Sequence, residues 1–236
     1  MKFSLRILFL LFVQTAFAQS DADDYLFYVQ NFADLLLATA KDDYGSKNTQ
    51  LWASVINAKT GKIPQPVEKV SPTQGTRPHD RAVWGSNFYH DIGTIKTFFA
   101  LSKLTGNNLY EQEARAYAKN FLRHTQHPET GLLGWGEHLY YHFYEDTVAV
   151  AAGIQNERDR YHEFLAATPP WPLLWSVDSM RTRKAIEALR FHFRGYQTQS
   201  YLFNRHANWD VVRPEATDWE RHQFQRDGQP WIKHSA

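Results

Sequence analysis

Three consecutive residues near the C-terminus, Asn204, Arg205 and His206, offer an amide, a guanidinium and an imidazole side by side. An amide or a guanidinium can neutralise a carboxylate, and an imidazole can take up a proton near neutral pH. Consecutive residues do not share one face of a helix or a strand, so the trio can converge only in a loop. An ordinary hydrogen-bond network in that loop is the alternative. The trio is therefore a candidate catalytic group.

A second group of candidate residues lies in the segment 132–146, which reads LLGWGEHLYYHFYED. Aromatic rings beside a few fixed polar groups are typical of a pocket for a flat, hydroxyl-covered ligand, so we predict that the segment forms the floor of a carbohydrate site. His138 is a second candidate base and Tyr140 a candidate acid. Trp135 and Glu137 are expected to contact the ligand. An ordinary aromatic core is the alternative.

Four further residues are candidates for binding a substrate. Asn87 stands where a helix is expected to begin, so it either contacts the substrate or caps that helix. Arg81 closes a long connection that contains prolines and glycines, and it lies either in a cleft or in a solvated turn. His162 and Glu163 are adjacent, and Glu163 with Glu137 would supply the two carboxylates that hydrolysis of a glycosidic bond requires. Alternatively, each glutamate pairs with its neighbouring histidine as a structural contact.

The sequence offers no specific metal site. His138 and His142 are four residues apart and could share a helical face, but their segment lacks the glutamate of the H-E-x-x-H motif. The chain has no cysteine, which excludes thiolate metal sites, disulfides and cysteine nucleophiles. A calcium ion held by carboxylates leaves no comparable signature. We therefore predict no metal ligands, and calcium stays open as a cofactor.

Composition bounds the class of protein. The 236 residues suffice for one domain with a hydrophobic core, and 43% of them are hydrophobic, which excludes a disordered chain. A formal net charge of +1 provides no basic field for binding nucleic acid or an anionic membrane. Aromatic residues make up 15% of the chain, which favours sugar binding. Nothing in the sequence indicates an oligomeric state.

The first 18 residues have the three parts of a secretory signal peptide: a charged start (MKFSLR), an apolar run (ILFLLFV) and an A-F-A cleavage site. The apolar run is far shorter than the ~20 residues that span a bilayer. We therefore predict a signal peptide over residues 1–18 and a single domain over residues 19–236. The mature protein is expected to be periplasmic or secreted, without membrane contact, and a permanent N-terminal anchor is the alternative.

Hydrophobic periodicity predicts a protein built from helices. Apolar residues recur at spacings of three and four, and glycines or prolines end these runs. The connection over residues 46–81 contains several prolines, and within it only residues 51–56 read as a short strand-like edge. The predicted fold class is all-α, with helices stacked as hairpins. The expected helices cover residues 22–44, 91–104, 108–125, 171–177 and 179–194, with a helical turn over residues 158–165.

Several segments resemble one family, in the same order along the chain. They are YLFYVQNFADLLL, DDYGSKNTQLWASVIN, GSNFYHD, ETGLLGWGEHLYYHF, PWPLLWSVD and FNRHANWD, all within residues 25–210. Together they are similar to exported bacterial pectate lyases and related α/α-toroid enzymes that degrade polysaccharides. The resemblance implies an (α/α) toroid. The chain offers fewer helices than a complete toroid, so the ring is expected to be incomplete at the C-terminus or to close with another polypeptide.

The same resemblance implies the reaction: cleavage of a uronic-acid polymer such as pectate by β-elimination. This reaction needs a group that neutralises the sugar carboxylate, a base for the adjacent proton and an acid for the leaving oxygen. The two candidate catalytic groups contain residue types for all three duties. A glycoside hydrolase on the same scaffold and a non-catalytic, truncated sugar-binding protein are the alternatives.

Overall fold

The computed structural model divides the chain into two compact units, Met1–Thr39 and Ala40–Ala236. The predicted signal peptide over residues 1–18 lies outside the residues that the structure describes. The described residues are 24–57, 59–66, 82–151, 160–164, 168–194, 202–203 and 205–212, without the side chains of 193–194 and 202–203.

The described part of the first unit is a helix over residues 24–39. The sequence predicted that this helix continues to Tyr44, and that extension is wrong. Lys41 instead forms an antiparallel β-bridge with Trp52. Main-chain groups that pair with a distant segment cannot also serve a continuing helix. The strand-like edge was predicted over residues 51–56, and within that range the bridge involves Trp52 alone.

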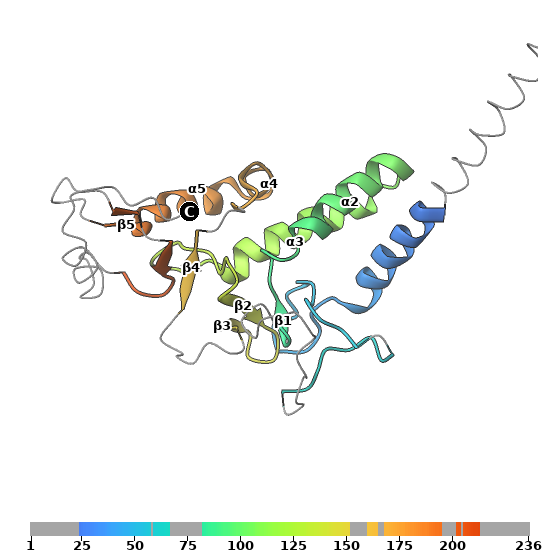
Figure 1. Ribbon diagram of the computed structural model, residues 1–236, viewed down its shortest axis with the longest axis horizontal. Coiled ribbons are helices and arrows are strands. Elements are labelled where there is room, and N and C mark those ends of the chain that lie inside the picture. Colours follow the sequence, from blue (N-terminus) through green and yellow to red (C-terminus); the bar gives the residue numbers. More distant parts are fainter. Residues whose placement is uncertain are drawn as a thin grey trace, which may run out of the picture. The chain divides into compact units, whose positions relative to one another are not determined.

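Two helices of the second unit form the hairpin that the sequence predicted. α2 (Ile92–Thr105) and α3 (Leu109–Thr125) lie side by side (Figure 1). Gly106 ends α2 with a φ of +72°, and its N–H donates to the carbonyl of Ser102 at 3.0 Å. A left-handed residue of this kind closes a helix and favours glycine, so the chain can turn directly into α3.

Aromatic rings on α3 and on the segments beside it form a core. Trp52 stacks on Tyr117 and Phe88 stacks on Phe121, each with ring centroids 4.2 Å apart. Trp135 packs against Phe88 and is 0% exposed. Burial of such large rings is a main source of stability in a domain of this size. The structure therefore places Trp135 in the core, and the prediction that it contacts a ligand is replaced by a packing role.

A small antiparallel sheet adjoins this core. Its strands are β1 (Gly85–Ser86), β2 (Leu139–His142) and β3 (Thr147–Val150), in the order β1-β2-β3. The middle strand pairs Tyr140 with Ala149, and α3 packs against β2 and β3. The sequence did not predict these strands, because strands this short contain too few residues to show an alternating pattern.

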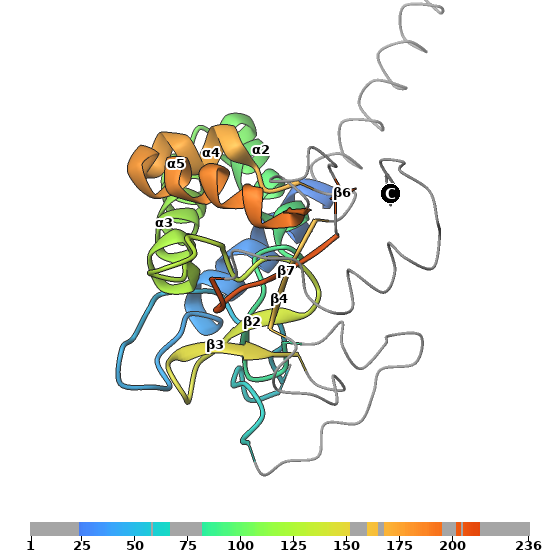
Figure 2. The same cartoon turned by 90° about the vertical axis from the view of Figure 1, so that its left-hand side faces the viewer.

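A separate pair of strands brings two distant segments together. β4 (Tyr161–Glu163) pairs antiparallel with β7 (His206–Asn208), and the two lie side by side in Figure 2. In this register Glu163 is opposite His206. The prediction of a helical turn over residues 158–165 is wrong, because the main chain of β4 pairs with a strand that no local pattern identifies as its partner.

The remaining helices follow the predicted positions with changed ends. Asp178 caps α5 by accepting a hydrogen bond from the N–H of Arg181 at 3.0 Å, and α5 begins at the next residue. The predicted helix over residues 179–194 ends early, because its last part forms a 3-10 turn and a strand. These elements are α4 (Trp171–Val177), α5 (Ser179–Ala188), η2 (Leu189–His192) and β5 (Phe193–Arg194), which pairs with β6 (Leu202–Phe203).

The described ranges thus combine helical hairpins with short antiparallel strands, which the expectation of an all-α fold did not include. An (α/α) toroid, complete or incomplete, stays a prediction. Within the same ranges, no helix is both long enough and apolar enough to span a membrane.

Candidate active site

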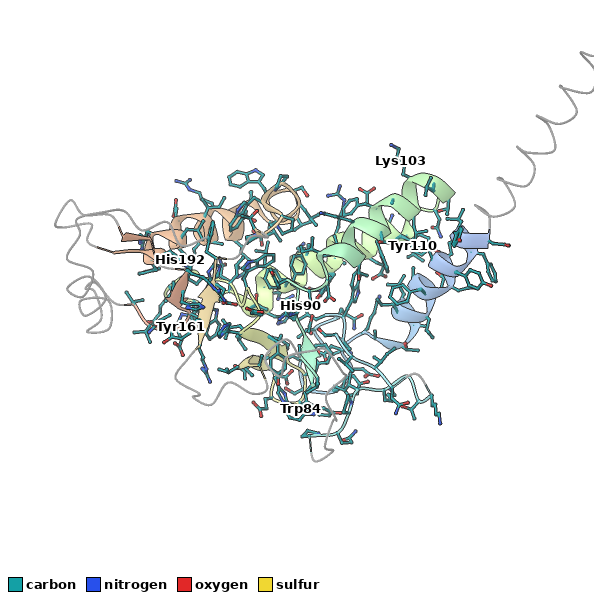
Figure 3. All side chains as sticks on the ribbon, viewed as in Figure 1. Trp84, His90, Lys103, Tyr110, Tyr161 and His192 are labelled. Carbon is teal, nitrogen blue, oxygen red and sulfur yellow. The ribbon has the colours of Figure 1, made fainter. Side chains whose placement is uncertain are left out.

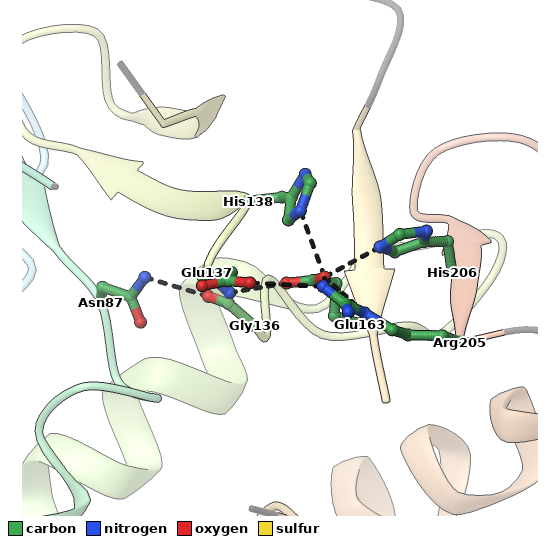
Figure 4. Close-up of polar contacts among 7 residues, drawn as sticks. All are labelled: Asn87, Gly136, Glu137, His138, Glu163, Arg205 and His206. Atoms are coloured by element: carbon green, nitrogen blue, oxygen red, sulfur yellow. Dashed lines mark hydrogen bonds and ion pairs between the residues drawn. The ribbon is translucent and has the colours of Figure 1, made fainter. Parts of the chain in front are cut away.

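Three polar side chains from two segments meet at one carboxylate, that of Glu163 (Figure 4). Nε2 of His206 lies 2.8 Å from Oε1 of Glu163, and Nε2 of His138 lies 3.2 Å from the same atom. Arg205 donates to this oxygen from Nη2 at 2.7 Å and from Nε at 3.1 Å. The paired strands β4 and β7 supply Glu163 and His206, and His138 immediately precedes β2.

These side chains lie partly at the surface. The side chains of Arg205, His206 and His138 are 38%, 34% and 21% exposed, while that of Glu163 is 0% exposed. Because the cationic and imidazole groups around the buried carboxylate are partly exposed, a ligand can contact these groups from the solvent. The cluster is therefore open to an anionic partner or to a metal ion.

The environment of Glu163 keeps its carboxyl group ionised. Burial by itself would raise the pKa of Glu163, but hydrogen bonds from His138, His206 and Arg205 outweigh burial and hold the pKa well below its usual range. Glu163 is consequently a permanent negative charge near neutral pH. A carboxylate of this kind can bind a cation, whereas it cannot donate a proton.

The donor set of the cluster fits a divalent transition metal. The ligand atoms that His138, Glu163 and His206 can offer all lie within 4.8 Å of one another. Two imidazole nitrogens with one carboxylate oxygen suit first-row divalent metals such as manganese, iron, nickel or zinc, whereas calcium prefers oxygen ligands alone. The sequence predicted no metal ligands and left calcium open, because the spacing of these three residues matches no linear motif.

The segment 136–138 is held against Glu163 by its main chain. The N–H of Glu137 donates to Oε2 of Glu163 at 2.9 Å. Gly136 has a φ of +110°, and a Cβ added there would lie 2.6 Å from Cβ of Glu163. Only glycine allows this approach without strain. Glu137 also accepts from Nη2 of Arg205 at 3.3 Å, so Arg205 contacts both glutamates.

Asn87 is a buried residue that binds the main chain of the segment around Gly136. It is 2% exposed, and its Nδ2 donates to the carbonyl of Gly136 at 3.0 Å (Figure 4) and to the carbonyl of Leu139 at 3.2 Å. Its Oδ1 accepts from the N–H of Tyr89 at 3.0 Å, so the whole amide is engaged. Asn87 was expected to contact the substrate or to cap α2. The structure assigns it neither role, because its side chain is buried and is bonded to the site-bearing segment.

The structure brings together five of the residues singled out in the sequence: His138, Glu137, Glu163, Arg205 and His206. Their roles stay predictions, but their convergence required three segments that are far apart in the chain to meet. Asn204 and Arg81 were predicted alongside them, and both lie outside the described residues.

Two other expected site residues are buried away from the cluster. Tyr140 is 3% exposed, and burial raises the pKa of its phenol well above the usual range, so the prediction that it serves as an acid is replaced by a packing role. His162 is buried on the opposite face of β4 from Glu163, and its Nδ1 lies 2.7 Å from Nε2 of His192. Burial and the charge of His192 lower the pKa of His162, so it is a structural residue rather than a substrate contact.

Tyr161 is a residue that the sequence reasoning missed. Its ring stacks on His206 with centroids 5.3 Å apart, on the face of β4 that also carries Glu163. Figure 3 labels Tyr161, the first residue of β4, and His192, the last residue of η2. The alternation of Tyr161, His162 and Glu163 would have placed the first and third on one face, had this segment been predicted as a strand.

The sequence matches the family described as periplasmic pectate lyase over residues 63–234, which is more than half of the chain and includes every residue of the cluster. The family description confirms the localisation predicted from the N-terminal residues, periplasmic or secreted. The chain therefore belongs to the periplasmic pectate lyase family.

Proposed function

We propose that the chain is a cation-dependent polysaccharide lyase that cleaves a pectate-like uronic-acid polymer by β-elimination. The observation that carries the proposal is the convergence of His138, Glu163 and His206 on one point beside the guanidinium of Arg205. Such a site combines a place for a divalent cation with a fixed positive charge. Membership of the pectate lyase family supports the same substrate class.

The chemistry of a uronate explains why such a site is useful. The proton next to the sugar carboxylate becomes acidic when the carboxylate is neutralised. A divalent cation bound by His138, Glu163 and His206 would supply that positive charge. Nε2 of each histidine would then be engaged in the cluster, so neither ring could take the proton through this atom.

Among the predicted catalytic residues that the structure describes, Arg205 remains available to the sugar. Tyr140 is buried, and the two histidines belong to the cation cluster. The guanidinium is 38% exposed and lies next to the shared oxygen of Glu163. We therefore assign Arg205 to direct contact with the substrate at its reacting uronate, where a guanidinium can pair with the carboxylate.

Hydrolysis of the same polymer is the weaker alternative. A glycosidase needs one carboxylic acid that donates a proton and a second carboxylate. The low pKa of Glu163 deprives it of the proton that the acid must donate, and Arg205 binds both Glu163 and Glu137. The two glutamates are therefore arranged to bind the guanidinium of Arg205 rather than to flank a glycosidic bond.

The test is incubation of the full chain with polygalacturonate, with and without added Mn²⁺ or Ni²⁺ after treatment with EDTA. A lyase forms an unsaturated product that absorbs ultraviolet light, a hydrolase forms only reducing ends, and a binding protein forms neither. We expect the absorbing product, restored by the transition metal and lost in Arg205→Ala. Arg183→Ala, which removes an arginine that is 74% exposed, is the matched control. Reducing ends without absorbance would overturn the proposal.

A further inference from the structure

Oε1 of Glu163 is approached by more groups than one carboxylate oxygen can serve. Both Nε and Nη2 of Arg205 donate to it, and Nε2 of His206 and Nε2 of His138 lie 2.8 and 3.2 Å away. An ionised carboxylate offers about two acceptor positions on each oxygen. A cation bound between the two histidines and this oxygen would therefore compete with Arg205 for Glu163.

Glu137 offers Arg205 a second carboxylate. Its Oε1 accepts from Nη2 of Arg205 at 3.3 Å, and its side chain is only 10% exposed. The main chain of Glu137 is anchored independently of the contested atom, because its N–H binds the other oxygen of Glu163, Oε2. Glu137 can therefore keep its place whichever group occupies Oε1.

We propose that Glu137 is a positioning residue: it holds the guanidinium of Arg205 beside the site when a cation takes Oε1 of Glu163. The inference rests on the proposed function, since it requires the cation cluster described above. With Glu137 in place, Arg205 has a partner that the cation does not contact. Without Glu137, Arg205 must either remain on Glu163 and oppose cation binding or leave the site.

The charges of these groups favour the same arrangement. Glu137, Glu163 and Arg205 together carry one negative charge when both histidines are neutral. A divalent cation changes this to one positive charge, which the carboxylate of a single uronate would neutralise. Loss of Glu137 would leave two positive charges close together in a partly desolvated site, and their repulsion would drive Arg205 away.

The first test measures cation affinity rather than activity. Isothermal titration with Mn²⁺ and with Ni²⁺ is applied to the wild type, Glu137→Gln, Arg205→Ala and the double variant. We expect Glu137→Gln to weaken cation binding about tenfold while Arg205 is present, and less than about threefold in the Arg205→Ala background. Equal effects in both backgrounds would overturn the inference, because they would show that Glu137 does not act through Arg205.

A second measurement separates positioning from a general loss of structure. At saturating Mn²⁺, Glu137→Gln should lower kcat about tenfold or more with little change in KM, while its circular dichroism stays that of the wild type. Glu187→Gln removes an exposed carboxylate that also pairs with an arginine, and it should change neither constant. If Glu137→Gln does not fold, Glu137→Asp should show the same dependence on Arg205, with a smaller decrease in cation affinity.

The outcomes distinguish this inference from the proposed function. A wild type that binds the cation and shows the Arg205-dependent effect, but forms no absorbing product, would contradict the lyase assignment alone. A wild type that forms the product, with a Glu137 effect that is independent of Arg205, would contradict the positioning role alone. Absence of cation binding in the wild type would overturn both the assignment of the cluster as a cation site and the positioning role of Glu137.

Discussion

The main-chain N–H of Glu137 donates a hydrogen bond of 2.9 Å to Oε2 of Glu163. This bond ties the segment before β2 directly to β4, and it does so at the carboxylate on which the other site residues converge. Geometry at the site therefore depends on how closely the main chain at 136–137 can approach Glu163.

Gly136→Ala should damage the site more than an ordinary glycine substitution. The φ of +110° strains any other residue, and the new Cβ would lie 2.6 Å from Cβ of Glu163. We expect a loss of about 3 kcal/mol in the free energy of unfolding and a weaker affinity for Mn²⁺. Chemical denaturation and calorimetric titration measure the two effects.

Gly93→Ala is the matched control for this substitution. An added Cβ at Gly93 meets nothing within 4 Å, and the residue lies in the first turn of α2. Alanine should therefore leave the stability unchanged or raise it by about 0.5–1 kcal/mol. Equal losses in the two variants would contradict the close-approach explanation.

Asn87→Ala should loosen the segment that carries His138. The substitution leaves the buried carbonyls of Gly136 and Leu139 without the amide that now binds them. The expected loss in unfolding free energy is about 2–3 kcal/mol, with weaker cation binding because His138 is no longer held in place. Asn107→Ala, which removes an exposed side-chain bond to the N–H of Leu109, should cost about 1 kcal/mol and leave cation binding intact.

His206→Ala and His138→Ala should each reduce affinity for Mn²⁺ or Ni²⁺ by about 100-fold or more, because each removes one of the three ligands that the described residues offer. His124→Ala is a suitable control, since His124 lies against Tyr141 and outside the cluster. Retained affinity in both site variants would show that His138 and His206 are not cation ligands. Calorimetric titration of EDTA-treated protein decides the matter.

Asp91 should make stability depend on pH. Burial raises the pKa of Asp91 to about 7, against the opposing effect of a hydrogen bond from Tyr117. The unfolded chain releases this proton at about pH 4, so between about pH 4 and 7 the folded state holds more protons and loses stability as pH rises. Below pH 4 the carboxyl group is protonated in both states, and its contribution is fully present.

Asp91→Asn removes this titration while keeping an oxygen that can accept from Tyr117. Relative to the variant, the wild type should lose about 3 kcal/mol of unfolding free energy between pH 4 and pH 7. Denaturation curves of both proteins across this range give the difference directly. A difference that stays constant with pH would show that Asp91 keeps an ordinary pKa.

The sequence by itself determined the local features of this protein. Periodicity predicted α2 and α3, and the glycines and prolines that end helical runs were visible, because helix formation and capping depend on residues that are close in the chain. The residue types of the cluster were also visible, since histidine, arginine and glutamate beside aromatic rings already indicate chemistry.

Only the tertiary structure decided which of these residues meet. The register of β4 against β7 places Glu163 opposite His206, and the hydrogen bond between Glu137 and Glu163 adds His138 to them. The tertiary structure also buries Trp135 and Tyr140, two residues whose types were equally suited to a binding site. Strand pairing across long stretches of chain depends on the packing of the whole domain, so local spacing carries no information about it.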